Sequence, residues 1–412
     1  MSLWRMAWSY LWDRKLTTSL TIVSVALSVG LISAVLTLRD ETRQRFEEEQ
    51  NAYDVVVGPP GSPLQLVLNS VYFIDQATGT IPYATYKKIL QHEDVTNAFP
   101  IALGDTYKGF RIVGTEPQLF QYPWESVRGE KRYPFQLEDG HFFEAPMEAV
   151  VGFRVANETG LKVGDEFVSL HGSIDMGELN EEDHSDTPYK VVGVLKPSGT
   201  SNDRAIFVDI GSVWETHKDG GGSLELVTTE GPQVTSVLVD LYTPATAFIF
   251  MQEMNKTYPV KSARPVDEIL KLYRNVLQPA VAILKGIGYI VVVISAISIL
   301  IGLYLSIIQR RRDLAIMRAL GASAGEIFGA VIIEAFLVTA MGIVAGWGAG
   351  KLGALALGAY TARAYGMGIT HLSTGPEELQ FFAVVALLGL LAGILPAWQA
   401  YQTDVAKNLT AT

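Results

Sequence analysis

Few side chains in this sequence have the type and spacing needed to bind a nucleotide or a metal ion. Residues 346–351 (GWGAGK) come nearest to the glycine-rich loop that holds nucleotide phosphates, but the spacing is wrong and the stretch is apolar. Residues 175–186 are rich in carboxylates and include His184, so a cation site is conceivable, but their spacing matches no defined metal loop and favours a solvated loop. The other histidines are scattered: His92, His141, His171, His217 and His371. We therefore predict no catalytic residue, no metal site and no ATPase activity in this chain.

The composition is typical of a membrane protein. Apolar residues make up 49% of the 412 residues and charged residues only 18%. The net charge of −11 makes attraction of the whole chain to nucleic acid unfavourable. The sequence contains no cysteine, which excludes disulfide bonds, thiolate metal sites and a cysteine nucleophile.

Four apolar segments are long enough to cross a bilayer, for which about 20 helical residues suffice. Charged residues delimit them, and only Glu334 interrupts one of them. The first segment is too long for a cleaved signal peptide, so we interpret it as a retained anchor. The alternative for each segment is a buried helix of a soluble protein. The predicted spans are 16–38, 286–309, 326–350 and 379–403.

Basic residues beside the spans predict the orientation, because Lys and Arg resist translocation. They cluster before the first span, between the second and third, and after the fourth. The segments 1–15, 310–325 and 404–412 are therefore expected in the cytoplasm, and 39–285 and 351–378 outside it. From residue 39 to residue 274 we count 36 acidic and 21 basic side chains, which agrees with this assignment.

The large external insert has the alternating apolar pattern of a mixed α+β domain. Expected helices cover 84–92 and 245–256, and one subdomain is expected to be inserted in another, since both ends of the insert must return to neighbouring membrane helices. Glycines at 220–222 predict a flexible turn. Strands are expected at 55–57, 71–74, 110–113, 149–151, 191–195, 205–209 and 237–241. The predicted fold class is thus an α-helical membrane domain of four transmembrane helices, with a large α+β extracytoplasmic domain between helices 1 and 2.

Both ends of this insert are expected to form helical stalks. Residues 39–52 contain neither Gly nor Pro and continue the first span. Pro279 is expected to kink the return helix near the membrane surface. The return segment has apolar residues at spacings of 4, 3, 4 and 3, which is typical of a coiled-coil seam, although a helix packed on its own domain fits equally well. The seam residues are Ile269, Tyr273, Val276, Ala280 and Ile283.

The segment between the second and third spans has the pattern of a short amphipathic surface helix that ends at a glycine. A helix held between two spans can transmit force from a cytoplasmic motor. The alternative is a basic loop lying on anionic lipid. The residues expected to contact an ATPase here are Arg310, Arg311, Arg312, Asp313, Leu314, Ile316, Met317, Arg318, Leu320 and Gly321.

This segment resembles the cytoplasmic coupling helix of the MacB/FtsX-type ABC transporter permeases, the mechanotransmission class that is related to the lipoprotein-releasing permeases. Asp313 stands where that family usually has Glu. The resemblance extends to 137–165 and 189–209 outside and to the Leu395-Pro396-Ala397 tail, where Trp398 replaces the usual Arg. One span, a large external domain and three further spans is also the order of elements in that family. The resemblance implies that the external domain has an inserted subdomain at about 100–225.

The resemblance implies a non-catalytic permease subunit in the bacterial cytoplasmic (inner) membrane. Its partners would be a cytoplasmic ABC ATPase, which binds the ATP and Mg, and a second permease copy or paralogue, giving a dimer. Movements of the extracytoplasmic domain would serve lipoprotein or lipid handling, efflux, or activation of a partner protein. Residues 57–73 are apolar and loop-like and are a candidate binding stretch for a lipid or acyl chain. The alternatives are a membrane-anchored sensor or scaffold without an ATPase and, with less support, an anchored hydrolase.

Polar and small residues inside the spans are the remaining candidates. Glu334 lies about eight residues into the third span, where a carboxylate needs a partner; Arg318 or the cytoplasmic interface is expected to supply it. Glycines at every fourth position let helices approach closely, so helix packing is their expected role. They are Gly342, Gly346 and Gly350 in the third span, and Gly389 and Gly393 in the fourth.

Overall fold

The computed structural model describes residues 4, 8–9, 11–12, 15–49, 52–74, 76–125, 131–171, 187–218, 224–229, 231–365, 372 and 374–402. The acidic stretch 175–186, the glycine turn at 220–222, His371 and the tail 404–412 lie outside these residues. The chain forms two compact units. The first comprises Met1–Thr42, Val276–Ala362 and Gly368–Thr412, and the second Arg43–Asn275 with Arg363–Met367.

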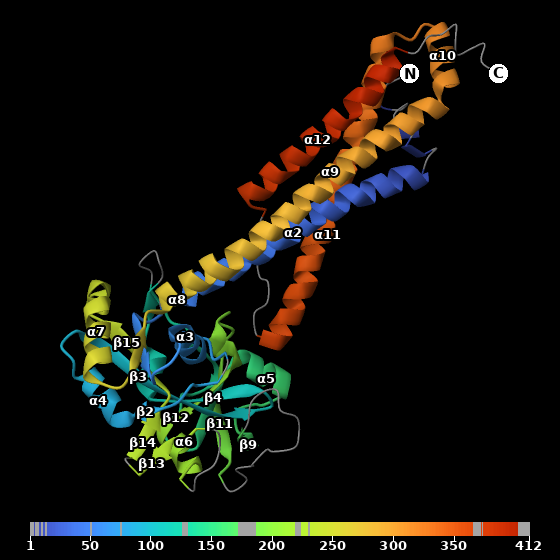
Figure 1. The fold of residues 1–412 in the computed structure, drawn as a ribbon. Helices are drawn as coiled ribbons and strands as arrows, with labels where there is room; N and C mark the ends of the chain where they lie inside the picture. The colour runs from blue at the N-terminus through green and yellow to red at the C-terminus, as the bar shows by residue number, and fades with distance from the viewer. Residues whose placement is uncertain are drawn as a thin grey trace. The chain divides into compact units, whose positions relative to one another are not determined.

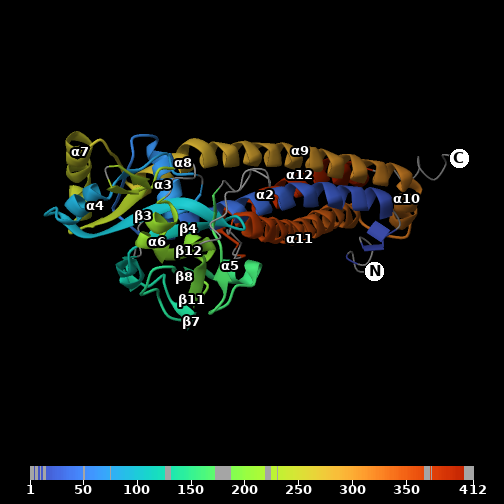
Figure 2. The ribbon, with the colours of Figure 1, turned by 90° about the horizontal axis from the view of Figure 1, so that it is seen from below.

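The first unit is a bundle of four helices that are long and apolar enough to cross a membrane. A short helix, α10 (Arg311–Ala319), lies between the second and third of them. In both views α9 and α12 run side by side (Figures 1 and 2). The prediction of four membrane-spanning helices is thus confirmed. The four are α2 (Lys15–Glu49), α9 (Gln278–Gln309), α11 (Ala324–Tyr365) and α12 (Pro376–Tyr401).

The expected loop at 351–378 is wrong over much of its length. Helix α11 continues to Tyr365, and α12 begins at Pro376. Lys351 and Glu378, which were used to mark the ends of two spans, are only 6% and 2% exposed. They form an ion pair with each other, so neither charge needs to lie at the water boundary.

Glycines bring the helices of the bundle into close contact. A Cβ atom on Gly346 would lie 2.5 Å from the carbonyl oxygen of Ala26, and one on Gly350 would lie 2.6 Å from that of Gly30. Gly342 meets α2 in the same way, whereas Gly389 and Gly393 face side chains of α11. The third span therefore packs against the first nearly backbone to backbone, as small residues permit.

The second unit is built on one sheet, whose path through the described residues is β16-β1-β15-β3-β4-β12-β8-β11-β7, with β10 beside β3 and β9 beside β11. Figure 2 shows β3, β4, β12, β8, β11 and β7 in succession. The strands are β1 (Val55–Gly58), β3 (Val95–Tyr107), β4 (Phe110–Thr115), β7 (Leu137–Gly140), β8 (Glu148–Val151), β9 (Glu166–Phe167), β10 (Leu170–His171), β11 (Tyr189–Leu195), β12 (Ala205–Asp209), β15 (Ser236–Leu241) and β16 (Lys261–Ala263). Short strands form two further ladders: β2 (Ile81–Pro82), β13 (Val227–Thr228) and β14 (Gly231–Val234), and β5 (Trp124–Glu125) with β6 (Lys131–Arg132).

Both faces of this sheet are buried, which explains its runs of consecutive valines. Val55 and Val57 belong to one hydrophobic cluster, and Val56 to the other. Six helices accompany the strands, so the α+β class is confirmed. They are α3 (Pro63–Val71), α4 (Tyr83–Leu90), α5 (Phe153–Thr159), α6 (Ile210–Thr216), α7 (Ala247–Thr257) and α8 (Pro265–Leu272).

Two local expectations for this unit are wrong. The strand expected at 71–74 does not form, because α3 ends at Val71 and residues 72–74 follow it outside any helix or strand. Helix α3 begins with Ser62 as N-cap and Pro63 in its first turn. The boundary expected near residue 100 lies within β3, which pairs with β15 along its first half and with β4 along its second. The two parts of the domain therefore share one strand.

The apolar stretch at 57–73 is helical rather than loop-like over most of its length, because α3 covers Pro63–Val71. Leu66 and Val67 are 2% and 0% exposed, and Val71 and Tyr72 are also buried. These side chains belong to the hydrophobic cluster beneath α3. They are packed inside the unit, and binding of a lipid or acyl chain at this stretch stays a prediction.

Candidate functional site

Helix α10 has one face in the bundle and one face in solvent. Leu314 and Ala315 are buried, and Leu314 belongs to one hydrophobic cluster with Ala397 and Ala400 of α12. Gly321 has a φ of +106°, a value that favours glycine and ends the helix. Its solvent-facing side chains are Arg311, Arg312, Asp313, Ile316 and Leu320, with Leu320 83% exposed. Basic and apolar groups thus project together from a helix that the bundle holds in place.

Arg310, expected on that outer face, instead turns toward the bundle. Its guanidinium lies 3.2 Å from a carboxylate oxygen of Glu334 and also contacts the hydroxyl of Ser306. Glu334 is 5% exposed, so this ion pair is withdrawn from water. The partner that we expected for Glu334 was Arg318; the ion pair described here is with Arg310. Met317 and Arg318 are half-buried.

A second buried ion pair lies at the other end of the bundle. The Lys351 ammonium is 3.0 Å from a carboxylate oxygen of Glu378 and donates a 2.8 Å hydrogen bond to the hydroxyl of Thr37. Ser33, one helical turn before Thr37, donates to the other carboxylate oxygen of Glu378. The three helices α2, α11 and α12 therefore meet at one cluster of satisfied polar groups.

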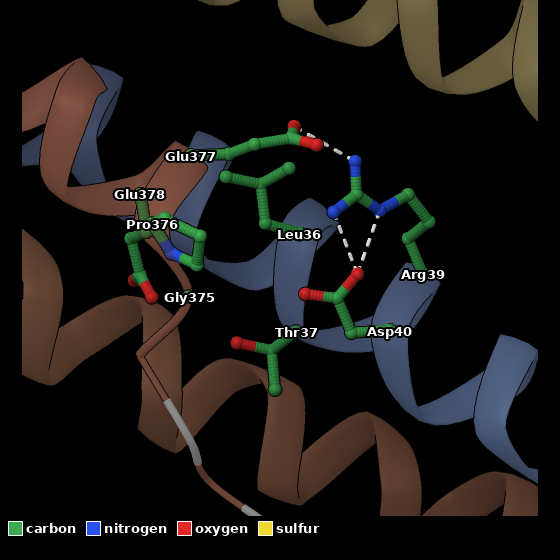
Figure 3. A pocket seen from close by; sticks show the side chains of 8 residues that line it. All are labelled: Leu36, Thr37, Arg39, Asp40, Gly375, Pro376, Glu377 and Glu378. Atoms are coloured by element: carbon green, nitrogen blue, oxygen red, sulfur yellow. Dashed lines mark hydrogen bonds and ion pairs between the residues drawn. The ribbon is translucent and has the colours of Figure 1, made fainter.

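Beside this cluster is a cavity of about 220 Å³, drawn in Figure 3. The guanidinium of Arg39 lies between the carboxylates of Glu377, at 2.8 Å, and Asp40, at 2.6 Å. Lys285 of α9 also reaches Glu377, at 2.6 Å. The lining residues are Leu36, Thr37, Arg39, Asp40, Gly375, Pro376, Glu377 and Glu378. Sequence reasoning missed this site because it read Lys351 and Glu378 as span ends.

The stalk residues separate into a buried and an exposed group. Ile269 is 3% exposed and belongs to a hydrophobic cluster of the sheet-containing unit. Val276 and Ile283 are 56% and 65% exposed, and Ala280 is exposed as well. A π-helical turn at Tyr273–Leu277 precedes Pro279, where the missing N–H prevents a regular helical hydrogen bond.

A buried polar cluster in the sheet-containing unit does not have the arrangement of a hydrolase. Asp105 accepts a 2.9 Å hydrogen bond from Ser169 and lies 3.2 Å from Nε2 of His217. The carboxylate is central, so the histidine does not face the serine as a general base would. Burial by itself lowers the pKa of His217, but the hydrogen bond and charge of Asp105 raise it above its ordinary value. This cluster fastens α6 to β3.

Two sequence models cover most of the chain. Residues 18–256 match the MacB-like periplasmic core domain, and residues 285–405 match the FtsX-like permease C-terminal domain. The chain belongs to the MacB/FtsX family of ABC transporter permeases. This permease therefore combines membrane-spanning helices with a periplasmic-type domain, in the order that its sequence motifs suggested.

Individual relatives of the permease are distant. An uncharacterised ABC transporter permease of Methanocaldococcus jannaschii is 21% identical over 64% of this chain and 62% of its own length. The macrolide export ATP-binding/permease protein MacB of Bordetella avium is 22% identical over 98% of this chain and 59% of its own. The solved periplasmic region of MacB from Actinobacillus actinomycetemcomitans is 11% identical, with a TM-score of 0.34 over 54% of this chain and 92% of that structure.

Proposed function

We propose that this chain is the permease subunit of an ABC transporter in the bacterial cytoplasmic membrane, where it couples ATP hydrolysis by a separate ATPase subunit to movements of its extracytoplasmic domain. The observation that carries the proposal is α10, whose outer face presents Arg311, Arg312, Ile316 and Leu320 while its inner face packs in the bundle. Such a face suits docking of a protein partner. The ATPase would bind ATP and Mg, since this sequence has no phosphate-binding loop.

The relatives support the same division of labour. The name of the Bordetella protein joins an ATP-binding part to a permease part, and this chain covers 59% of that protein. Outside the cytoplasm, the movement would act on lipidated cargo, an exported compound or a partner protein.

The proposal is tested by co-expression with the ABC ATPase encoded beside this chain, followed by purification in detergent. We expect the two chains to co-elute, and the double change Arg311→Glu and Arg312→Glu to weaken the complex about tenfold and slow ATP turnover, because both arginines face solvent on α10. The matched control is Lys162→Glu with Lys190→Glu, which reverses two exposed charges in the other unit. Absence of a complex would favour the sensor or scaffold.

We further propose that a second copy of the chain pairs along α9. Exposed residues recur along this helix at alternating spacings of 4 and 3, a period that supports a parallel coiled coil. Lys285 pairs with Glu377 at 2.6 Å, and the exposed apolar row continues past Lys285 to Val276, which is 56% exposed. This exposed seam of α9 differs from the seam expected from the sequence and consists of Val276, Ala280, Ile283, Ile287, Ile290, Ile294, Ile297 and Ile301.

A further inference from the structure

The two buried ion pairs of the bundle share one helix. Glu334 and Lys351 both belong to α11 and are 17 positions apart, which corresponds to about 25 Å of helix. Each has its partner on another element: Arg310 follows α9, and Glu378 is in the first turn of α12. Helix α11 is therefore fastened by a carboxylate near one end of the bundle and by an ammonium near the other.

The first pair ties α11 to the coupling helix. Arg310 is the single residue between α9 and α10, so a displacement of α10 moves its backbone directly. Glu334 is 5% exposed, and separating it from Arg310 would break a 3.2 Å ion pair that is withdrawn from water, which is costly. The pair is consequently expected to stay together, and α11 to follow Arg310.

Between the two pairs α11 has little room to deform. Gly346 and Gly350 place its backbone against the backbone of α2 at Ala26 and Gly30. Such a contact permits sliding or tilting of whole helices more readily than bending of one of them. A displacement at Glu334 should therefore reach Lys351.

The second pair forms part of the cavity wall. Glu378 lines the cavity, and Thr37, which accepts the hydrogen bond from Lys351, lines it too. Movement of Lys351 would pull on both side chains. The separate rim of Arg39, Glu377 and Lys285 then remains to hold α2, α9 and α12 together.

We propose that α11 is a relay that couples the position of the coupling helix to the opening of the cavity between α2 and α12, through the pairs Arg310–Glu334 and Lys351–Glu378. Glu334 and Lys351 are thus positioning residues that act through their partners. The relay rests on the proposed function only in taking α10 as the element that an ATPase moves.

The sequence contains no cysteine, so a single introduced thiol reports on the cavity without background. We choose Leu36→Cys, because Leu36 lines the cavity and is 3% exposed. The full-length chain in detergent is treated with a charged methanethiosulfonate reagent, and the rate of modification is measured. Glu334 is about 25 Å from Lys351 along α11. We expect Glu334→Gln to raise the rate of modification about tenfold by releasing α11 from Arg310.

The matched control is Glu326→Gln, the same chemical change in the first turn of α11. Glu326 is exposed and caps its own helix through Ser323, so its loss should leave the rate within about twofold. Lys351→Met should raise the rate directly. The exchange Lys351→Glu with Glu378→Lys should return it toward the starting value, because the pair is restored with reversed polarity.

Ser306→Ala is a milder second variant, in case Glu334→Gln does not fold. It removes a hydroxyl that contacts Arg310. We expect a smaller rise in the same direction from a chain whose thermal unfolding is unchanged. If Lys351→Met raises the rate but neither Glu334→Gln nor Ser306→Ala does, the relay is wrong. If no variant changes the rate, the pair at Lys351 does not control the cavity and the inference is overturned as well.

This experiment needs no ATPase, so its outcome is separate from that of the proposed function. A chain that binds its ATPase but shows no effect of Glu334 on the cavity would be a permease without this relay. A chain that binds no ATPase but shows the effect would have coupled helices without the proposed motor.

Discussion

Lys351 and Glu378 are charged side chains inside an apolar bundle, and their local surroundings explain why they are tolerated. Each charge faces the other; the Lys351 ammonium also donates to the hydroxyl of Thr37, and Glu378 accepts from the hydroxyl of Ser33. A hydropathy argument treats each charge alone and so places it at a water boundary. The sequence feature that could have indicated a buried ion pair lies on the first span, where Ser33 and Thr37 are one helical turn apart and place two hydroxyls on one face.

His217 gives a prediction at the same scale, for the sheet-containing unit. Its pKa is raised in the folded chain, so its contribution to stability is full below the unfolded value of about 6.5 and is lost as the pH rises through the folded value. Hydrogen exchange of β3 and α6, corrected for the intrinsic rate, should therefore lose protection as the pH is raised from about 6 to about 8. His217→Asn should flatten this dependence at a cost on the order of 2 kcal/mol.

The control is His92→Asn. The His92 ring lies within 4.0 Å of Asp94 and Glu253, at a more exposed position than His217. The His92→Asn change leaves the contact between Asp105 and His217 intact, so β3 and α6 should still lose protection from hydrogen exchange as the pH rises. The same loss of protection in His217→Asn as in the unaltered chain would show that another group causes it.

At the scale of elements, the sequence predicts a helix or strand whose surroundings are the same along its whole length. The prediction fails where one element contacts different neighbours along its two halves. The four spans and the strands at 110–113 and 205–209 follow from local pattern. The long strand β3 was not predicted. It holds Pro100 and is shared by two halves of the sheet, so its pattern of burial changes along its length. The inward turn of Arg310 likewise depends on Glu334, 24 residues further along the chain.

The glycine contact between α2 and α11 makes a prediction at this scale. Gly346→Ala would put a methyl group 2.5 Å from the carbonyl oxygen of Ala26 and 2.7 Å from Val29, so helices must move apart. We expect a loss of about 1–3 kcal/mol, seen as a lower midpoint of thermal unfolding in detergent. Gly348→Ala is the matched control, because nothing lies within 4 Å of the added atom. Alanine also favours helix there by up to about 1 kcal/mol, so the midpoint should hold or rise. Equal midpoints for the two variants would contradict close packing at Gly346.

For the whole molecule, the exposed seam of α9 predicts which positions meet in a dimer. Cysteine at Ile290 or Ile294 should form a disulfide between two copies under mild oxidation in native membranes, because seam positions face each other in a parallel coiled coil. Val293→Cys is the control. Val293 and Ile294 are both 52% exposed but point in different directions on the helix. The fraction of dimer on a non-reducing gel is the measurement, and equal cross-linking at 293 and 294 would contradict a defined seam.

The two ion pairs on α11 also bear on the effect of the membrane potential. A charge that crosses the full field changes its energy by about 2.3 kcal/mol for every 100 mV. Glu334 and Lys351 have opposite charges, and each is accompanied by a counter-charge, Arg310 or Glu378. When α11 moves with both partners, it transfers no net charge through the field. Such a movement is electrically silent, so the energised state of the membrane neither drives it nor opposes it.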